Sequence, residues 1–312
     1  MNTELERGAI SVAGVRRTYW LARGRPRGPL MIVLHGSGMD GETMARFTGL
    51  AARGPAAGIT TVFPDGWKGT WHAAGVPDRV ADVDDTLFLA ALASRLEVQG
   101  AAQSWPVFLA GVSTGALFAE HIARHGLLRV GGLFLVAGTA LEVSRRSAPQ
   151  PLLRTRTVIV MGTGDRSVPY QGGRLTGRGL TGALKKLRAA RRPKQPGDDV
   201  VAAAEDIAAD WASGNGSGAA PLVVEELAGD QPDLPVTRKT WSAPGCHPVT
   251  LYRISGGGHG WPGGSQFLPA RVAGQVSRGL DATGILLTMA QRAGEVPLGR
   301  PLASQAARSA TA

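Results

Sequence analysis

The 312-residue sequence has one cysteine, Cys246, which excludes an internal disulfide. It has no uninterrupted apolar stretch of about 18 residues, the length that a membrane-spanning helix needs. The first residues, "MNTELERGAISV", lack the basic start and following apolar stretch of a secretory leader. No internal repeat is visible. We therefore expect a protein without a membrane span that works in the cytoplasm, or a mature secreted form whose leader has been removed.

Acidic residues are the minority among the charges, with 24 Asp and Glu against 34 Lys and Arg, and the formal net charge is +10. Residues 174–194, "RLTGRGLTGALKKLRAARRPK", contain eight basic residues and no acidic one. Such a run suits nucleic acid or a membrane surface. However, it lacks the aromatic residues that stack on bases and the apolar face that inserts into lipid. We expect a solvated segment and no specific nucleic-acid partner, with polyanion binding as the alternative.

Six continuous apolar runs indicate strands that are buried on both faces, as in a parallel sheet. Helix-like segments with repeated leucine and alanine follow several of them, which predicts an α/β fold. The expected strands span 29–36, 58–66, 105–111, 130–138, 157–165 and 249–259, and the expected helices span 81–98, 114–126 and 275–294. We predict one domain over 1–298 with a mostly parallel central sheet flanked by helices. An insertion at about 171–245 lies between late strands, as a lid or cleft wall, and residues 299–312 form a flexible tail.

The run "VFLAGVSTGALFAEH" places Ser113 between Gly111 and Gly115, with an expected strand before it and an expected helix after it. This is the context of the G-x-S-x-G turn, which projects a serine hydroxyl above an α/β sheet. A serine hydroxyl is a poor nucleophile unless a neighbouring base takes its proton. We therefore predict that Ser113 is a catalytic nucleophile.

The base and the acid should follow the serine in the order acid, then histidine. Asp165 ends the strand run in "GTGD", and His259 follows a strand in "GGGHGWPGG". Both lie past the carboxyl ends of strands, where open α/β sheets bind their ligands. We predict His259 as the base and Asp165 as the acid. The alternatives for the acid are Asp198, Asp199 and Asp206, none of which directly follows a strand.

Two backbone N–H groups should stabilise the oxyanion, one from Thr114 and one from Ser37 or its neighbour. His35 precedes the loop that contains Ser37 and is expected either to hold this loop in place or to contact the substrate. Trp71 and Trp261 flank the predicted site and are expected to form its aromatic walls, although core burial is equally compatible.

His121 and His125 have a spacing that can bind a metal, but no third ligand is evident and the H-E-x-x-H motif is absent. We therefore predict no metal and no cofactor.

Seven segments together resemble the poly(3-hydroxybutyrate) depolymerase and feruloyl esterase branch of the α/β-hydrolases. In chain order they are "LHGSGMDGETM", "VFPDGWKGTW", "DVDDTLFLAAL", "LAGVSTGALFA", "MGTGDRSVPYQGG", "LYRISGGGHGWPGG" and "VSRGLDATGILL". The resemblance runs from about residue 12 to 294. It implies an α/β-hydrolase fold and a serine ester hydrolase with Ser113, Asp165 and His259 as its triad.

The sequence departs from this branch where relatives often have a disulfide, because Ser217 replaces the first cysteine near "WASGNGSGAAP". The expected activity is hydrolysis of a small-molecule or polymeric ester through an acyl-enzyme, and small or soluble esters fit a cytoplasmic protein best. The alternatives are an acyltransferase on the same triad and a non-catalytic protein that binds a polyanion.

Overall fold

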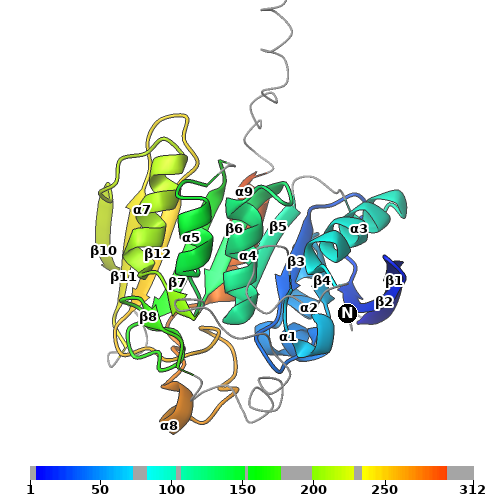
Figure 1. Ribbon diagram of the computed structural model, residues 1–312, viewed down its shortest axis with the longest axis horizontal. Coiled ribbons are helices and arrows are strands. Elements are labelled where there is room, and N and C mark those ends of the chain that lie inside the picture. The colour runs from blue at the N-terminus through cyan, green and yellow to red at the C-terminus, as the bar shows by residue number, and fades with distance from the viewer. Residues whose placement is uncertain are drawn as a thin grey trace, which may run out of the picture.

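The computed structural model describes residues 5–72, 83–102, 107–151, 154–176, 199–227 and 234–293. Its centre is a ten-stranded sheet in the order β1-β2-β4-β3-β5-β6-β7-β12-β11-β10 (Figure 1). The strands are β1 (Glu6–Val12), β2 (Val15–Ala22), β3 (Leu30–Leu34), β4 (Thr60–Pro64), β5 (Val107–Val112), β6 (Val130–Val136), β7 (Arg156–Gly162), β10 (Val223–Leu227), β11 (Val236–Trp241) and β12 (Val249–Ile254). A separate pair is formed by β8 (Gly173–Arg174) and β9 (Val200–Val201).

The six strands that the sequence predicts form the parallel centre of the sheet, β4-β3-β5-β6-β7-β12. Every residue of β3, β4, β5 and β6 is buried, which explains why their sequences are continuously apolar. Antiparallel strands extend both edges, with β1 and β2 beside β4, and β11 and β10 beside β12. The α/β class with a mostly parallel sheet is confirmed.

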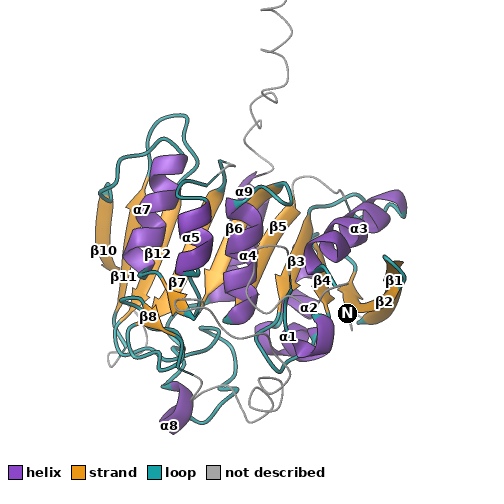
Figure 2. Cartoon of the chain, in the orientation of Figure 1, coloured by secondary structure: helices purple, strands orange, loops and turns teal. Residues whose placement is uncertain are grey.

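Helices cover both faces of the sheet (Figure 2). They are α1 (Gly41–Thr48), α2 (Leu50–Ala56), α3 (Asp85–Val98), α4 (Thr114–Arg124), α5 (Glu142–Ser147), α7 (Ala204–Gly214), α8 (Ala270–Ala273) and α9 (Ala282–Ala293). The apolar sides of α3, α4 and α7 pack into one core, and those of α1, α2 and α9 pack into the core on the other face. In the described part of the chain, no helix is long and apolar enough to cross a membrane.

Two helices begin later than the sequence suggests. Helix α3 begins at Asp85 because the carboxylate of Asp84 accepts the N–H groups of Thr86 and Leu87 and so caps the helix. Helix α9 begins at Ala282, and residues 275–281 form the loop before it. The loop carbonyl of Gln275 accepts the N–H of Gly258 instead of a helical partner.

The described parts of the insertion predicted over about 171–245 belong mostly to the main fold, as a helix that packs on the sheet and as two strands that extend it. Helix α7 packs against β7 and β12, and its Trp211 is fully buried. Strands β10 and β11 then continue the sheet beyond β12. The basic run overlaps the described residues only up to 176, so its remainder and a role as a lid lie outside the described residues.

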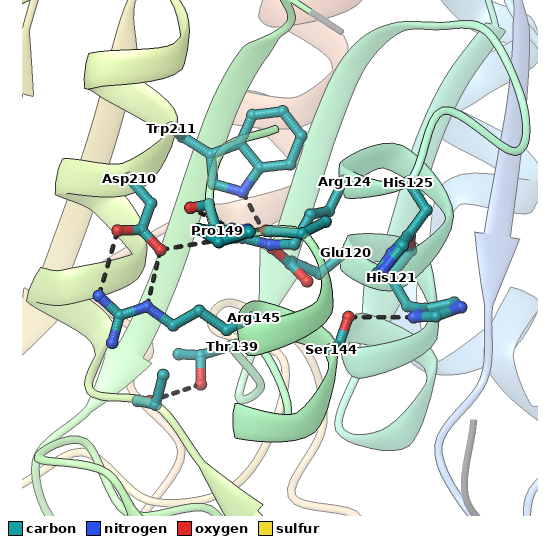
Figure 3. Close-up of polar contacts among 12 residues, drawn as sticks. Glu120, His121, Arg124, His125, Thr139, Ser144, Arg145, Pro149, Asp210 and Trp211 are labelled. Atoms are coloured by element: carbon teal, nitrogen blue, oxygen red, sulfur yellow. Dashed lines mark hydrogen bonds and ion pairs between the residues drawn. The ribbon is translucent and has the colours of Figure 1, made fainter. Parts of the chain in front are cut away.

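Helix α4, which follows the serine of the G-x-S-x-G motif, is anchored by buried ion pairs (Figure 3). The side chains of Glu120 and Arg124 are fully buried and bonded at 2.6 Å. Arg124 also reaches Asp210 of α7, and Asp210 accepts two further bonds from Arg145 of α5. Burial raises the pKa of Glu120. The network therefore ties α4, α5 and α7 together on one face of the sheet.

Candidate active site

Ser113 occupies a strained turn between β5 and α4. Its backbone has φ 57° and ψ −123°, values that L-residues rarely adopt. Neighbouring hydrogen bonds hold the turn, because the Ser113 N–H donates to Val136 and the Ser113 carbonyl accepts from Ala116 and Leu117. Residues held in this way cluster at functional sites. The turn is the strand-to-helix geometry that the motif predicts.

The two glycines of the motif are required by close packing. A Cβ added at Gly111 would lie 2.4 Å from the carbonyl group of Gly115. A Cβ added at Gly115 would lie 2.4 Å from the carbonyl oxygen of Leu34 on β3. Neither glycine has a positive φ. Spacing between backbones, and not turn conformation, therefore explains why glycine flanks Ser113 on both sides.

The predicted acid, Asp165, and the predicted base, His259, are joined by a direct contact. Nδ1 of His259 lies 2.7 Å from Oδ2 of Asp165, whose side chain is fully buried, whereas the His259 side chain is 10% exposed. The other carboxylate oxygen of Asp165 accepts the N–H groups of Ser167 and Val168 at 2.7 and 2.9 Å. A carboxylate acceptor fixes the proton of neutral His259 on Nδ1 and leaves Nε2 as the basic nitrogen.

Glycines bring the loop after β7, which holds Asp165, into backbone contact with the loop after β12, which holds His259. A Cβ at Gly162 would lie 2.1 Å from the carbonyl oxygen of Gly257, and one at Gly164 would lie 2.6 Å from that of Gly256. The Gly164 N–H donates to the Gly257 carbonyl at 2.8 Å. The runs "GTGD" and "GGGH" are therefore two halves of one packed unit that orients the carboxylate toward the imidazole.

Ser113, Asp165 and His259 each follow a parallel strand, β5, β7 and β12 respectively. Because the carboxyl ends of parallel strands lie at one edge of a sheet, the three residues share that edge.

The loop after β3 lies beside the turn that holds Ser113. The Ser37 and Thr114 hydroxyl oxygens are 3.0 Å apart. Thr114 is the first residue of α4, so its N–H has no partner within the helix. Among the described residues, neither the Ser37 nor the Thr114 N–H donates to a backbone carbonyl. Both predicted oxyanion donors are thus available to a ligand.

Comparison with known proteins identifies the family of the chain. The chain is 32% identical over 292 residues to "Putative esterase NocK" of Nocardia uniformis subsp. tsuyamanensis, a match that covers 87% of this chain and 78% of the relative. The chain belongs to this esterase family. Its fold is similar to that of an acetyl xylan esterase from Aspergillus awamori, with a TM-score of 0.54 and 13% identity over 82% of this chain and 94% of that one. No protein-family model matches the chain.

The esterase therefore has the α/β-hydrolase fold and is a hydrolase that acts on esters. The structure also locates the remaining residues that the sequence singled out.

His35 is fully buried in the esterase and links two loops. Its Nδ1 donates to the Gly36 carbonyl at 2.8 Å, and its Nε2 accepts the Gly66 N–H at 2.9 Å. Burial lowers the pKa of His35, which agrees with a neutral ring in which Nε2 is an acceptor. The enclosed ring presents no surface to a substrate, so we assign His35 to holding the loop and not to substrate binding.

Both tryptophans predicted as cleft walls are core residues in this structure. Trp71 is 5% exposed, stacks on Phe118 with ring centroids 5.5 Å apart, and donates to the His35 carbonyl. Trp261 is fully buried and donates to the Thr283 hydroxyl. Position beside a catalytic loop did not distinguish a wall from a core residue, because both environments favour a large aromatic ring.

His121 on α4 and His125, which caps this helix, contact hydroxyl groups: His121 contacts Ser144 and His125 contacts Ser147, at 3.0 Å each. In the described ranges, no group of three or more His, Cys, Asp or Glu residues is arranged to hold a metal.

Two of the alternative acids form ion pairs with arginines. Asp199 pairs with Arg174, and Asp206 pairs with Arg145. Asp198 lies outside the described residues.

Proposed function

We propose that the esterase is a serine-dependent carboxylic ester hydrolase that works through an acyl-enzyme. Ser113 is the nucleophile, His259 the general base and Asp165 the carboxylate that orients it. The observation that carries the proposal is the 2.7 Å bond between His259 and the buried Asp165, at the sheet edge that also bears the strained Ser113.

In the first half-reaction, the Ser113 hydroxyl attacks the ester carbonyl while Nε2 of His259 takes its proton. The negative oxygen of the tetrahedral intermediate accepts the N–H groups of Thr114 and Ser37. The alcohol then leaves with the proton from His259. Water repeats the sequence on the acyl-enzyme and releases the acid, and Asp165 stabilises the charged imidazole in both halves.

We place the esterase in the poly(3-hydroxybutyrate) depolymerase and feruloyl esterase branch as part of the same proposal. Support comes from the motifs "VPYQGG" and "GGGHGWPGG", whose residues build the acid and base loops. Tyr170 of the first motif donates to Glu205 at 2.6 Å and so ties the acid loop to α7. The proposed substrates are small or soluble esters.

The test compares the parent protein with Ser113→Ala and with Ser213→Ala, a matched control on the exposed surface of α7. Substrates are p-nitrophenyl esters from acetate to decanoate, methyl ferulate and a soluble 3-hydroxybutyrate oligomer. We expect Ser113→Ala to fall to background and Ser213→Ala to match the parent.

A fluorophosphonate probe should add its mass to the Ser113 peptide in the parent and in Ser213→Ala only. Activity of Ser113→Ala equal to the parent, or labelling at another residue, would contradict the proposal.

A further inference from the structure

A hydrogen bond between side chains joins the two segments that carry the proposed oxyanion donors. Ser37 lies in the loop after β3, and Thr114 is the first residue of α4, 77 positions further along the chain. Their hydroxyl oxygens are 3.0 Å apart. The bond therefore runs from one donor residue to the other, beside Ser113.

The backbone around Ser37 is held on either side of this residue but not at the residue itself. Gly36 packs against Ser113, because a Cβ at Gly36 would lie 3.3 Å from the Ser113 Cβ. Gly38 donates to the Gly69 carbonyl at 3.0 Å. Within the described ranges, no backbone hydrogen bond involves the N–H or the carbonyl of Ser37. The hydrogen bond of the Ser37 side chain to Thr114 therefore holds the residue whose N–H must point at the oxyanion.

The bond contributes little to holding the fold together. Ser37 and Thr114 are both partly exposed, and a hydrogen bond in such a place has a small net effect on stability. The neighbouring segments are already fixed, because Gly115 packs against the carbonyl groups of Leu34 and His35. Loss of the bond should therefore change the orientation of the donors and leave the fold intact.

We infer that the side chains of Ser37 and Thr114 are positioning residues, which hold the two oxyanion N–H groups at the spacing that the tetrahedral intermediate needs. The inference rests on the proposed function. Loss of a whole oxyanion donor lowers kcat by about 10²–10³-fold. Misplacing the two N–H donors without removing them should lower kcat by less than this, about 5- to 30-fold.

The test measures kcat and KM on p-nitrophenyl butyrate for Ser37→Ala, Thr114→Val, Thr114→Ser and the double variant Ser37→Ala/Thr114→Val. Thr288→Val, which removes an exposed hydroxyl on α9, is the control. We expect the two single losses to lower kcat about 5- to 30-fold and to leave KM within about 2-fold, since the donors act on the intermediate. Thr114→Ser keeps the hydroxyl and should retain nearly the parent kcat.

The double variant should be no more than about 2-fold slower than the slower single variant, because each change breaks the same bond. Parent-like kcat in Ser37→Ala and Thr114→Val, or losses that multiply in the double variant, would overturn the inference. If the melting curve shows that Thr114→Val does not fold, the kcat values of Ser37→Ala and Thr114→Ser still test the inference, because only Ser37→Ala removes the bond between the hydroxyl groups.

Fluorophosphonate labelling separates this inference from the proposed function. A parent protein that is neither labelled at Ser113 nor active refutes the proposed function and, with it, the positioning role. A parent that is labelled and active, beside Ser37→Ala and Thr114→Val variants with unchanged kcat, refutes the positioning role alone.

Discussion

Replacing Asp165 with asparagine changes one atom, and the structure fixes how the new side chain must sit. One oxygen of Asp165 accepts the N–H groups of Ser167 and Val168, and the other accepts from His259. The asparagine oxygen must keep the two backbone donors, because the reversed amide would point its NH₂ group at two N–H groups. The NH₂ group then faces Nδ1 of His259.

Facing a donor, Nδ1 must present its lone pair, and the single proton of neutral His259 moves to Nε2. A ring in this tautomer cannot accept the proton of Ser113. The equivalent exchange in a Ser-His-Asp triad lowers kcat by about 10⁴-fold, and we expect a fall of about 10³–10⁴-fold here. The number of hydrogen bonds is conserved, so the free energy of unfolding should change by less than about 1 kcal/mol.

The assay is steady-state hydrolysis of p-nitrophenyl butyrate, with urea denaturation of the same samples as a check on folding. Asp206→Asn is the matched control, because this carboxylate pairs with Arg145 and does not contact His259. If Asp165→Asn keeps more than about a tenth of the parent kcat while remaining folded, the tautomer argument is wrong.

Two further changes probe buried charge. Arg124→Met leaves the buried carboxylate of Glu120 without its cation, so urea denaturation should show that the free energy of unfolding falls by about 3–5 kcal/mol. Adding Glu120→Gln to this variant should restore part of the loss. An unchanged free energy of unfolding in Arg124→Met would refute the ion-pair assignment. For His35, burial lowers the pKa below the ordinary value of 6.5, so the unfolded chain takes up the proton first as pH falls. Its contribution to stability is complete above pH 6.5 and is lost as pH falls from there through the lowered pKa. His35→Gln should therefore lose less stability than the parent between about pH 7.5 and about pH 5, and equal losses would contradict this.

The parallel centre of the sheet could be predicted because burial on both faces requires continuous apolar runs, as in β3 and β5. The edge strands could not. In β10, "VVEEL", three residues are exposed, two are half-buried and none is buried, and two of the five are glutamates. Such a strand pairs on one side only, so its sequence has neither the apolar run nor a clear alternation.

In the candidate site, the sequence predicted that Ser113, Asp165 and His259 each lie just after a buried strand, because each follows an apolar strand run. It did not predict what holds them. The contact between Gly162 and Gly257 joins residues far apart in the chain, and composition alone does not show which glycines meet. The same holds for the hydroxyl contact between Ser37 and Thr114, which depends on the register of β3 beside β5.

The order of the strands along the chain separates the synthesis of the proposed nucleophile from that of its proposed base. Ser113 follows β5, whereas His259 follows β12, roughly 150 residues later. At about 5–20 residues per second, a ribosome completes the nucleophile turn about 7–30 s before it adds the base. Once β7 has been made, it lacks its neighbour β12 until residues 249–254 follow, and the proposed nucleophile has no proton acceptor. Under the proposed mechanism, the growing chain gains esterase activity only after His259 has been added, and until then its unpaired β7 edge is a surface that a chaperone would have to protect.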